Sequence, residues 1–153
     1  MKIKAGTFLQ SAASLDDPAF EKVIIFITEY NSSGATGFVV NKLHGRLLNE
    51  LAEFSGSVSL SLYAGGPVKN DQLYFVHNNP HLIQDGMQIT KDVYLGGNFK
   101  QALENINSKS IDENNIKLFV GYCGWDAGQL EQEIEEGSWL PVENETMNVF
   151  ENY

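Results

Sequence analysis

The clearest feature of the hydrophobic pattern is an uninterrupted apolar run, Val23–Ile27, inside the segment 22–29. Its β-branched and aromatic residues favour a strand, and an apolar run without alternation is typical of a strand covered on both faces. The polar cluster Asn31–Gly34 then predicts a turn, and Thr36–Val40 predicts a second strand. We expect these two strands to pair as an antiparallel hairpin or meander.

Two segments carry apolar residues at helical spacing. Over 46–54 this spacing predicts a short amphipathic helix, and its apolar positions are Leu47, Leu48, Leu51 and Phe54. Asn98 is a good helix N-cap, and Gln101 three residues later predicts a variant of the capping box. The apolar face of the helix that Asn98 opens consists of Phe99, Ala102, Leu103 and Ile106.

The strongest local helix signals follow Trp125. Asp126 is predicted as the N-cap of a last helix, with Gln129 at its third position. Trp125 is placed to pack on Leu130 as a hydrophobic staple, and Gly137 fits the left-handed residue that ends the final turn. The glutamates of this helix are expected to face solvent; they are Glu131, Glu133, Glu135 and Glu136.

Further short strands are predicted from apolar and β-branched runs at Leu62–Ala64, Leu73–Val76, Val93–Leu95, Lys117–Tyr122 and Trp139–Val142. The segments Asp16–Pro18 and His77–Asp85 have the composition of turns and loops. Many strands together with about three helices indicate an α+β fold.

The composition favours one domain over residues 1–153. With 42% hydrophobic and 20% charged residues, the chain has ample material for a packed core. Twenty acidic residues against ten basic ones give a formal charge of −10, and the basic residues are spread along the chain. Because nucleic acids bind through clustered Lys and Arg, this distribution argues against direct nucleic-acid binding.

The compartment is predicted from the single cysteine and from the apolar runs. Cys123 is the only cysteine, so an intramolecular disulfide is impossible, which fits a reducing compartment. The longest apolar run is far shorter than the roughly 20 residues of a membrane helix, and the N-terminal residues do not resemble a signal peptide. We therefore expect a cytoplasmic protein without a membrane partner, and a monomer or weak oligomer.

Three groups of residues were weighed for chemistry. Cys123 follows a predicted strand and is interpreted as a small buried hydrophobe. The start of the predicted helix after Asp126 is close enough to favour a thiolate, but the charge of Asp126 would raise the pKa of the thiol. His77, His81 and Asp71 do not have the spacing of a metal site. The glycine pairs Gly65–Gly66 and Gly96–Gly97 match no dinucleotide or phosphate-loop motif and are interpreted as turns, although Gly97 precedes a helix where an anion could bind. No catalytic residue, metal or cofactor is therefore predicted.

Several motifs in order resemble one family over about residues 6–142. They are "GTFLQSAASLDDPAFEKVIIFITEYNSSGATGFVVNK", "LYAGGPVKNDQLYFVH", "VYLGG" and "LFVGYCGWDAGQLEQEIEEGSWL". Together they resemble the bacterial YqgE/AlgH family, whose function is uncharacterised. The resemblance implies an α+β fold with a mixed, mostly antiparallel sheet that is partly curled like an open barrel and flanked by about three helices. Some members are labelled transcriptional regulators, although the family pattern contains no DNA-binding motif.

This chain departs from the family pattern at three places. The family usually has alanine where this chain has Cys123, and often arginine-proline where it has Lys42-Leu43. Members commonly continue into a helical C-terminal tail beyond the position of Tyr153. The resemblance therefore implies either a short member or a truncated chain.

The resembling stretches share aromatic and glycine-rich positions at predicted strand ends. Ligand and partner sites often form at such positions on a rigid scaffold. The hypothesis is that they line a groove for a small ligand or a partner segment. The residues are Asn41, Gly65, Gly66, Pro67, Tyr122, Trp125 and Trp139.

Three functions follow from these observations. The first is a non-catalytic regulatory or interaction domain that binds an unidentified protein or a small ligand. The second is a transcriptional regulator that acts on DNA directly or indirectly. The third is a cryptic hydrolase or nucleotide-binding enzyme, which needs Cys123, a histidine and the glycine turns in one pocket.

Overall fold

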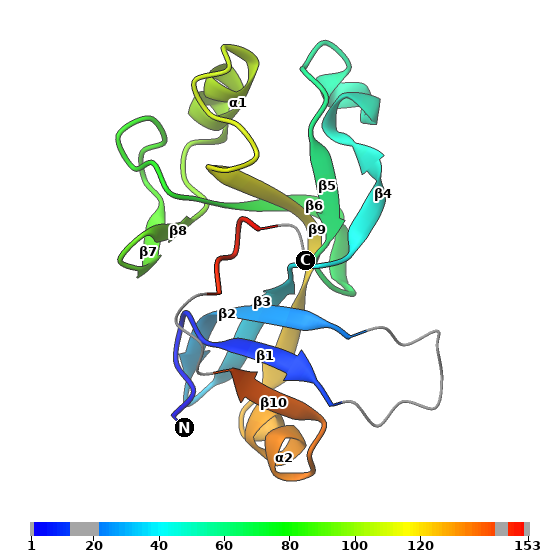
Figure 1. Ribbon diagram of the computed structural model, residues 1–153, viewed down its shortest axis with the longest axis vertical. Coiled ribbons are helices and arrows are strands. Elements are labelled where there is room, and N and C mark those ends of the chain that lie inside the picture. The colour runs from blue at the N-terminus through cyan, green and yellow to red at the C-terminus, as the bar shows by residue number, and fades with distance from the viewer. Residues whose placement is uncertain (1, 13–21, 143–146, 152–153) are drawn as a thin grey trace.

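The computed structural model describes residues 2–12, 22–142 and 147–151. Within this part the structure has ten strands, two α-helices and two short 3₁₀ helices (Figure 1). The strands are β1 (Phe8–Ser11), β2 (Ile24–Asn31), β3 (Gly34–Val39), β4 (Leu43–Leu47), β5 (Ser61–Ala64), β6 (Val68–His77), β7 (Met87–Thr90), β8 (Val93–Leu95), β9 (Ile116–Asp126) and β10 (Trp139–Val142). The helices are η1 (Leu48–Glu50), η2 (Ala52–Phe54), α1 (Phe99–Asn107) and α2 (Gln129–Glu135).

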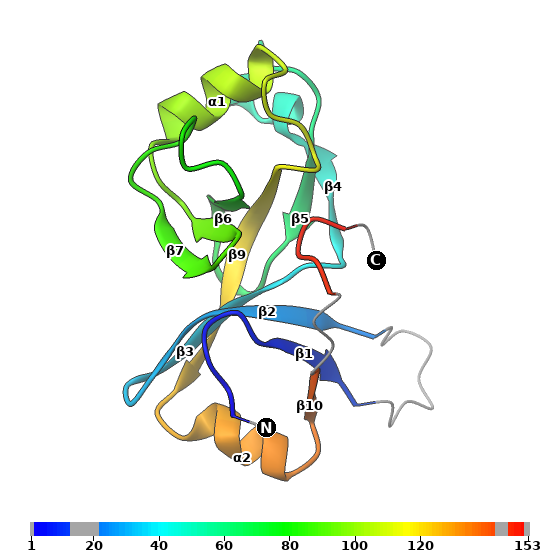
Figure 2. The same cartoon turned by 60° about the vertical axis from the view of Figure 1, so that its left-hand side comes forward.

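Strand β9 connects the two halves of the molecule. The strand order is β10-β1-β2-β3-β9-β6-β8-β7, and β5 also pairs with β9 and carries β4 beside it. The first part of β9 pairs with β5 and β6, and its last part pairs with β3. β9 therefore runs from the half that carries α1 to the half that carries α2 (Figures 1 and 2).

The predicted hairpin is confirmed. β2 and β3 pair antiparallel, with Asn31 opposite Gly34. The apolar run is covered on both faces as predicted: Ile24 and Phe26 pack into one core, and Ile25 and Ile27 pack into another. Alternating side chains of one strand point to opposite faces, so this run needs both cores to bury all of its residues.

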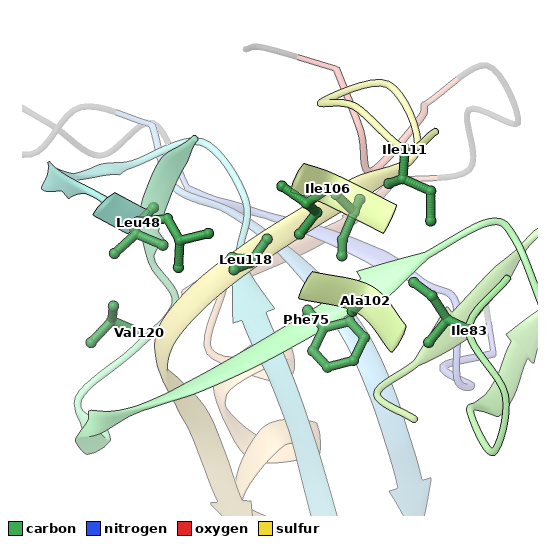
Figure 3. Packing of buried hydrophobic residues seen from close by; sticks show 10 residues of the cluster. Leu48, Phe75, Ile83, Ala102, Ile106, Ile111, Leu118 and Val120 are labelled. Atoms are coloured by element: carbon green, nitrogen blue, oxygen red, sulfur yellow. The ribbon is translucent and has the colours of Figure 1, made fainter. Parts of the chain in front are cut away.

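Two of the hydrophobic cores lie under the α-helices. In the upper half, α1 buries Ala102 and Ile106 against Phe75 and Leu118 (Figure 3). In the lower half, Leu130 of α2 packs with Trp125 and with residues of β1 and β2. The predicted apolar face of α1 and the predicted contact of Trp125 with the α2 region are both confirmed.

The helix caps follow the prediction in part. The Asn98 side chain accepts the Gln101 N–H at 3.0 Å, as predicted, but the Gln101 side chain accepts the Gln84 N–H at 2.8 Å and so leaves the capping box incomplete. The N-cap of α2 is Gly128 rather than Asp126, which still belongs to β9. At the end of α2, Gly137 has φ +85°, which confirms the predicted left-handed stop.

The helix predicted over 46–54 is wrong. Residues 46 and 47 end β4, and the rest forms η1 and η2, which are separated by Leu51 in an extended conformation with ψ 134°. Three of the four apolar residues of this segment face the core, with Leu48 fully buried and Leu51 and Phe54 packed beside it, whereas Leu47 is exposed. A helix this short gains little from its few internal hydrogen bonds, so packing and pairing with β5 determine its shape.

The sheet is open. β10 and β7 end its main path, and β4 pairs only with β5 among the described residues, so the predicted barrel-like curl does not close. Two α-helices are present in the described ranges instead of about three. The single parallel pair, β5 with β9, makes the sheet mixed but mostly antiparallel.

Three strands were not predicted, namely β1, β4 and β7, and β6 begins at Val68, earlier than expected. The predicted turn at Asp16–Pro18 lies outside the described residues. In the described ranges, neither α-helix has the length and apolar character that crossing a membrane requires.

Candidate functional site

A cleft of about 650 Å³ opens in the upper half of the molecule. One wall is formed by η1 and η2, and Arg46 extends into it from β4. The other side is formed by β6 and by Phe99, the first residue of α1. A cleft between rigid elements that holds apolar and charged groups together is a common form of binding site.

The floor of the cleft is aromatic. Phe54 and Phe99 meet edge to face, with ring centroids 5.5 Å apart and planes at 75°. The ring centroid of Phe75 lies 5.7 Å from that of Phe99, and Phe75 belongs to the buried core under α1 (Figure 3). Phe54 and Phe99 are half-buried, so part of each ring still faces the cleft. These two rings therefore offer apolar surface to an occupant.

The rim of the cleft is charged. It carries the carboxylates of Glu50, Glu53 and Asp71 and the guanidinium of Arg46, and all four residues are exposed. Glu50 accepts the backbone N–H of Leu47 at 3.1 Å. Within the described ranges, Arg46, Glu53 and Asp71 make no hydrogen bond or ion pair, so their charges face solvent.

Beside the cleft, Asn49 has a buried side-chain oxygen that has no hydrogen-bond partner among the residues that the structure describes. A buried polar atom without a partner is rare in folded proteins, because leaving it unpaired costs free energy. Asn49 belongs to η1, the same turn that supplies Glu50 to the rim.

A wider hollow of about 1650 Å³ lies between the N-terminal residues, the β7–β8 turn and the C-terminal residues. Its walls include Val142 and Met147, which flank residues 143–146. Since that segment lies outside the described residues, the functional argument rests on the smaller cleft.

The predicted groove residues separate into two groups. In the first group, Trp125 and Trp139 meet edge to face with centroids 6.4 Å apart. Both indole N–H groups donate to the same carboxylate oxygen of Glu133, at 3.1 and 2.9 Å. Glu133 is therefore half-buried against the protein, and the prediction that it faces solvent is wrong.

The second group surrounds the point where β9 passes from one half to the other. Gly65 donates its N–H to the Val120 carbonyl at 2.9 Å, and a Cβ on Gly66 would overlap the backbone of Tyr122. These glycines are required for close backbone packing. Pro67 directly follows them, and the Tyr122 ring packs edge to face on Tyr74 at 5.5 Å.

Asn41 lies near this second group and holds the start of β2. Its side chain accepts the Ile24 N–H at 3.0 Å and donates to the Lys22 carbonyl at 2.6 Å. None of the predicted groove residues lines the aromatic cleft. The groove hypothesis as a whole stays a prediction.

The thiol of Cys123 lacks the surroundings of a nucleophile. Its Sγ lies 3.5 Å from the Gly65 carbonyl, and burial raises its pKa to about 11. His77 pairs with Ile116 at the other end of β9, and a strand rises about 3.3 Å per residue, so the two side chains lie about 20 Å apart. Cys123 and His77 therefore do not form one site.

His77 is a buried structural residue. One ring nitrogen accepts the Asn79 N–H at 3.2 Å and the other lies 3.0 Å from the Gly96 carbonyl, which fits a neutral ring that donates to that carbonyl. Burial lowers its pKa. Among the described residues no group of three or more His, Cys, Asp or Glu could hold a metal ion.

Local sequence patterns do not indicate the cleft residues. Arg46 is the only arginine of the chain, and it lies among leucines at the end of β4. Phe54 and Phe99 belong to predicted apolar helix faces that are expected to pack into the core. Their partial exposure depends on η2 and α1 meeting at β6, which no local pattern indicates.

The architecture defines this protein as an α+β domain built on an open, mostly antiparallel sheet. A family model described as AlgH-like matches residues 8–153. The chain belongs to this family, in agreement with the resemblance to the YqgE/AlgH family.

Relatives and solved structures agree with this assignment. The chain is 35% identical over 143 residues to a UPF0301 protein of Chlorobium limicola, covering 93% of this chain and 76% of that protein. It is 33% identical to a UPF0301 protein of Cytophaga hutchinsonii, covering 95% of this chain and 80% of that protein. The solution structure of the AlgH protein from Pseudomonas aeruginosa has a TM-score of 0.74 and 25% identity, covering 99% of this chain and 86% of that one.

Proposed function

We propose that this protein is a non-catalytic interaction domain and that its binding site is the aromatic cleft between η1–η2, β6 and α1. The observation that carries the proposal is the combination of half-buried phenyl rings with rim charges that have no partner in the described ranges. Apolar surface supplies affinity, and a few fixed charges supply orientation and specificity. Regulation through a bound partner is the corresponding biological role.

Direct action on DNA has less support. α2 contains no Lys or Arg, and α1 contains only Lys100. An enzyme that uses Cys123 is disfavoured by the raised pKa of its thiol and by its distance from His77.

Site-specific photocrosslinking in the source cells tests the proposal. A photoreactive benzoylphenylalanine is placed at Gln72 on the cleft rim or, as a control, at the exposed Ser59, which does not line the cleft. The same pair is made with Ala52→Trp, which fills the cleft from η2 without removing core atoms. We expect a discrete adduct from position 72 that the Ala52→Trp change removes, and none from position 59. An absent adduct, or one that persists in the filled cleft, contradicts the proposal.

A further inference from the structure

The rim of the cleft carries a net negative charge. Three carboxylates, those of Glu50, Glu53 and Asp71, stand against the single guanidinium of Arg46, so the rim has an excess of two negative charges. The whole chain adds to this field, with a formal charge of −10. Charged surfaces of one sign attract partners of the opposite sign and repel those of the same sign.

The aromatic floor of the cleft favours the guanidinium of arginine over the ammonium of lysine as the bound cation. The face of a phenyl ring attracts a cation, and a guanidinium stacks on such a face more readily than an ammonium does. Phe54 and Phe99 line the same cleft as Glu53 and Asp71, whose carboxylates have no partner among the described residues. An arginine side chain can stack on the rings and bind a carboxylate with two parallel hydrogen bonds.

The size and openness of the site favour a segment of a protein. A volume of about 650 Å³ holds several side chains, and the cleft opens to solvent beside exposed residues of η2 and β6. An occupant that carries apolar side chains next to the cation would cover the phenyl rings that the fold leaves half-exposed. Phosphate-bearing ligands are disfavoured because the excess charge of the rim is negative.

We infer that the occupant of this cleft is a segment of a partner protein that carries arginine next to aromatic or aliphatic residues. This inference rests on the proposed function and adds the chemistry of the partner to it. The apolar side chains of the segment cover Phe54 and Phe99, and its arginine binds Glu53 and Asp71.

Fluorescence anisotropy with designed peptides tests the inference. The probes are three labelled peptides of equal length: one alternates Arg with Trp and Leu, one has Glu in place of each Arg, and one has Ser in place of each Trp and Leu. We expect the basic-apolar peptide to bind at least about tenfold more tightly than the other two, because both the charge and the apolar contacts contribute.

Charge-reversed variants distinguish local recognition from general attraction to an acidic protein. Glu53→Lys with Asp71→Lys is compared with Glu135→Lys with Glu136→Lys on the exposed face of α2, which changes the net charge equally. We expect the cleft pair to weaken binding at least about tenfold and the α2 pair to weaken it less than about threefold. Equal losses would show nonspecific attraction and overturn the inference.

The filled-cleft variant Ala52→Trp separates the two proposals. Loss of peptide binding in Ala52→Trp, without an effect of the cleft charge reversal, would keep the cleft as the site and overturn the basic partner. Binding of the acidic peptide in preference to the basic one would also overturn it. If the basic-apolar peptide does not bind, the inference is overturned, while the crosslinking at position 72 still decides whether the cleft is used.

Discussion

At the scale of single residues, Glu133 joins two aromatic side chains that are distant in sequence. Trp125 lies at the end of β9 and Trp139 at the start of β10, and one carboxylate oxygen accepts the indole N–H of both. A carboxylate is a stronger acceptor than a neutral group, so it holds both rings on the lower core. The tryptophans therefore have a structural role that their position at strand ends does not reveal.

We predict that Glu133→Ala lowers the free energy of unfolding by about 1 to 3 kcal/mol, because two indole N–H groups lose their acceptor. Urea denaturation followed by tryptophan fluorescence measures this change. Glu135→Ala on the same helix is the control, since Glu135 is exposed and is expected to change stability by less than about 0.5 kcal/mol. Equal effects of the two substitutions would contradict the role assigned to Glu133.

The residues that line the aromatic cleft could not be predicted from the sequence at this scale. The predicted groove residues lie elsewhere: Trp125 and Trp139 pack on each other, and Asn41 and Tyr122 meet other neighbours. Arg46 and Phe99 are more than fifty positions apart and line one cleft because of sheet order. Side-chain chemistry can be predicted from the sequence, whereas proximity of distant residues depends on topology.

At the scale of elements, local signals predicted best where one residue decides the backbone. Asn98 begins α1 as expected, because its side chain caps the helix, and Gly137 ends α2 as expected, because it adopts a positive φ. The segment 46–54 was predicted wrongly because its apolar spacing is compatible with a helix and also with two short turns packed on the core. Edge strands such as β7 have too few apolar residues to be recognised alone.

Two glycines allow a test of local backbone geometry against tertiary packing. Gly137→Ala places a Cβ in open space, so only the left-handed conformation opposes it, and we expect a loss of about 1 kcal/mol in stability. Gly66→Ala places a Cβ into the backbone of Tyr122, and we expect a loss of about 3 kcal/mol or more, or failure to fold. Thermal and urea denaturation measure both. A Gly66→Ala protein as stable as Gly137→Ala would contradict the tight backbone crossing.

At the scale of the whole molecule, Lys117 links three segments. Its side chain is buried, and its Nζ donates to the Val40 carbonyl at 3.1 Å and to the Glu151 carbonyl at 2.9 Å. The same ammonium lies 4.4 Å from the centre of the Tyr63 ring. One cation thus connects β9, the end of the β2–β3 unit and the C-terminal residues. Among the described residues, no carboxylate lies at ion-pair distance from it.

This arrangement predicts a pH dependence of stability. Burial lowers the pKa of Lys117 to about 8, against an opposing effect of Glu151. The unfolded chain, whose lysine pKa is near 10.5, therefore binds more protons than the folded chain between about pH 8 and 10.5. Over that window the contribution of Lys117 to the free energy of unfolding rises with pH.

We expect the difference in unfolding free energy between the wild-type protein and Lys117→Met to shift in favour of the wild type as the pH rises from about 7.5 to about 10. Urea denaturation across this range measures it, and Lys100→Met, at an exposed position of α1, should show no such trend. If the difference between the wild-type protein and Lys117→Met stays constant with pH, burial does not lower the pKa of Lys117, and the predicted pH dependence is contradicted.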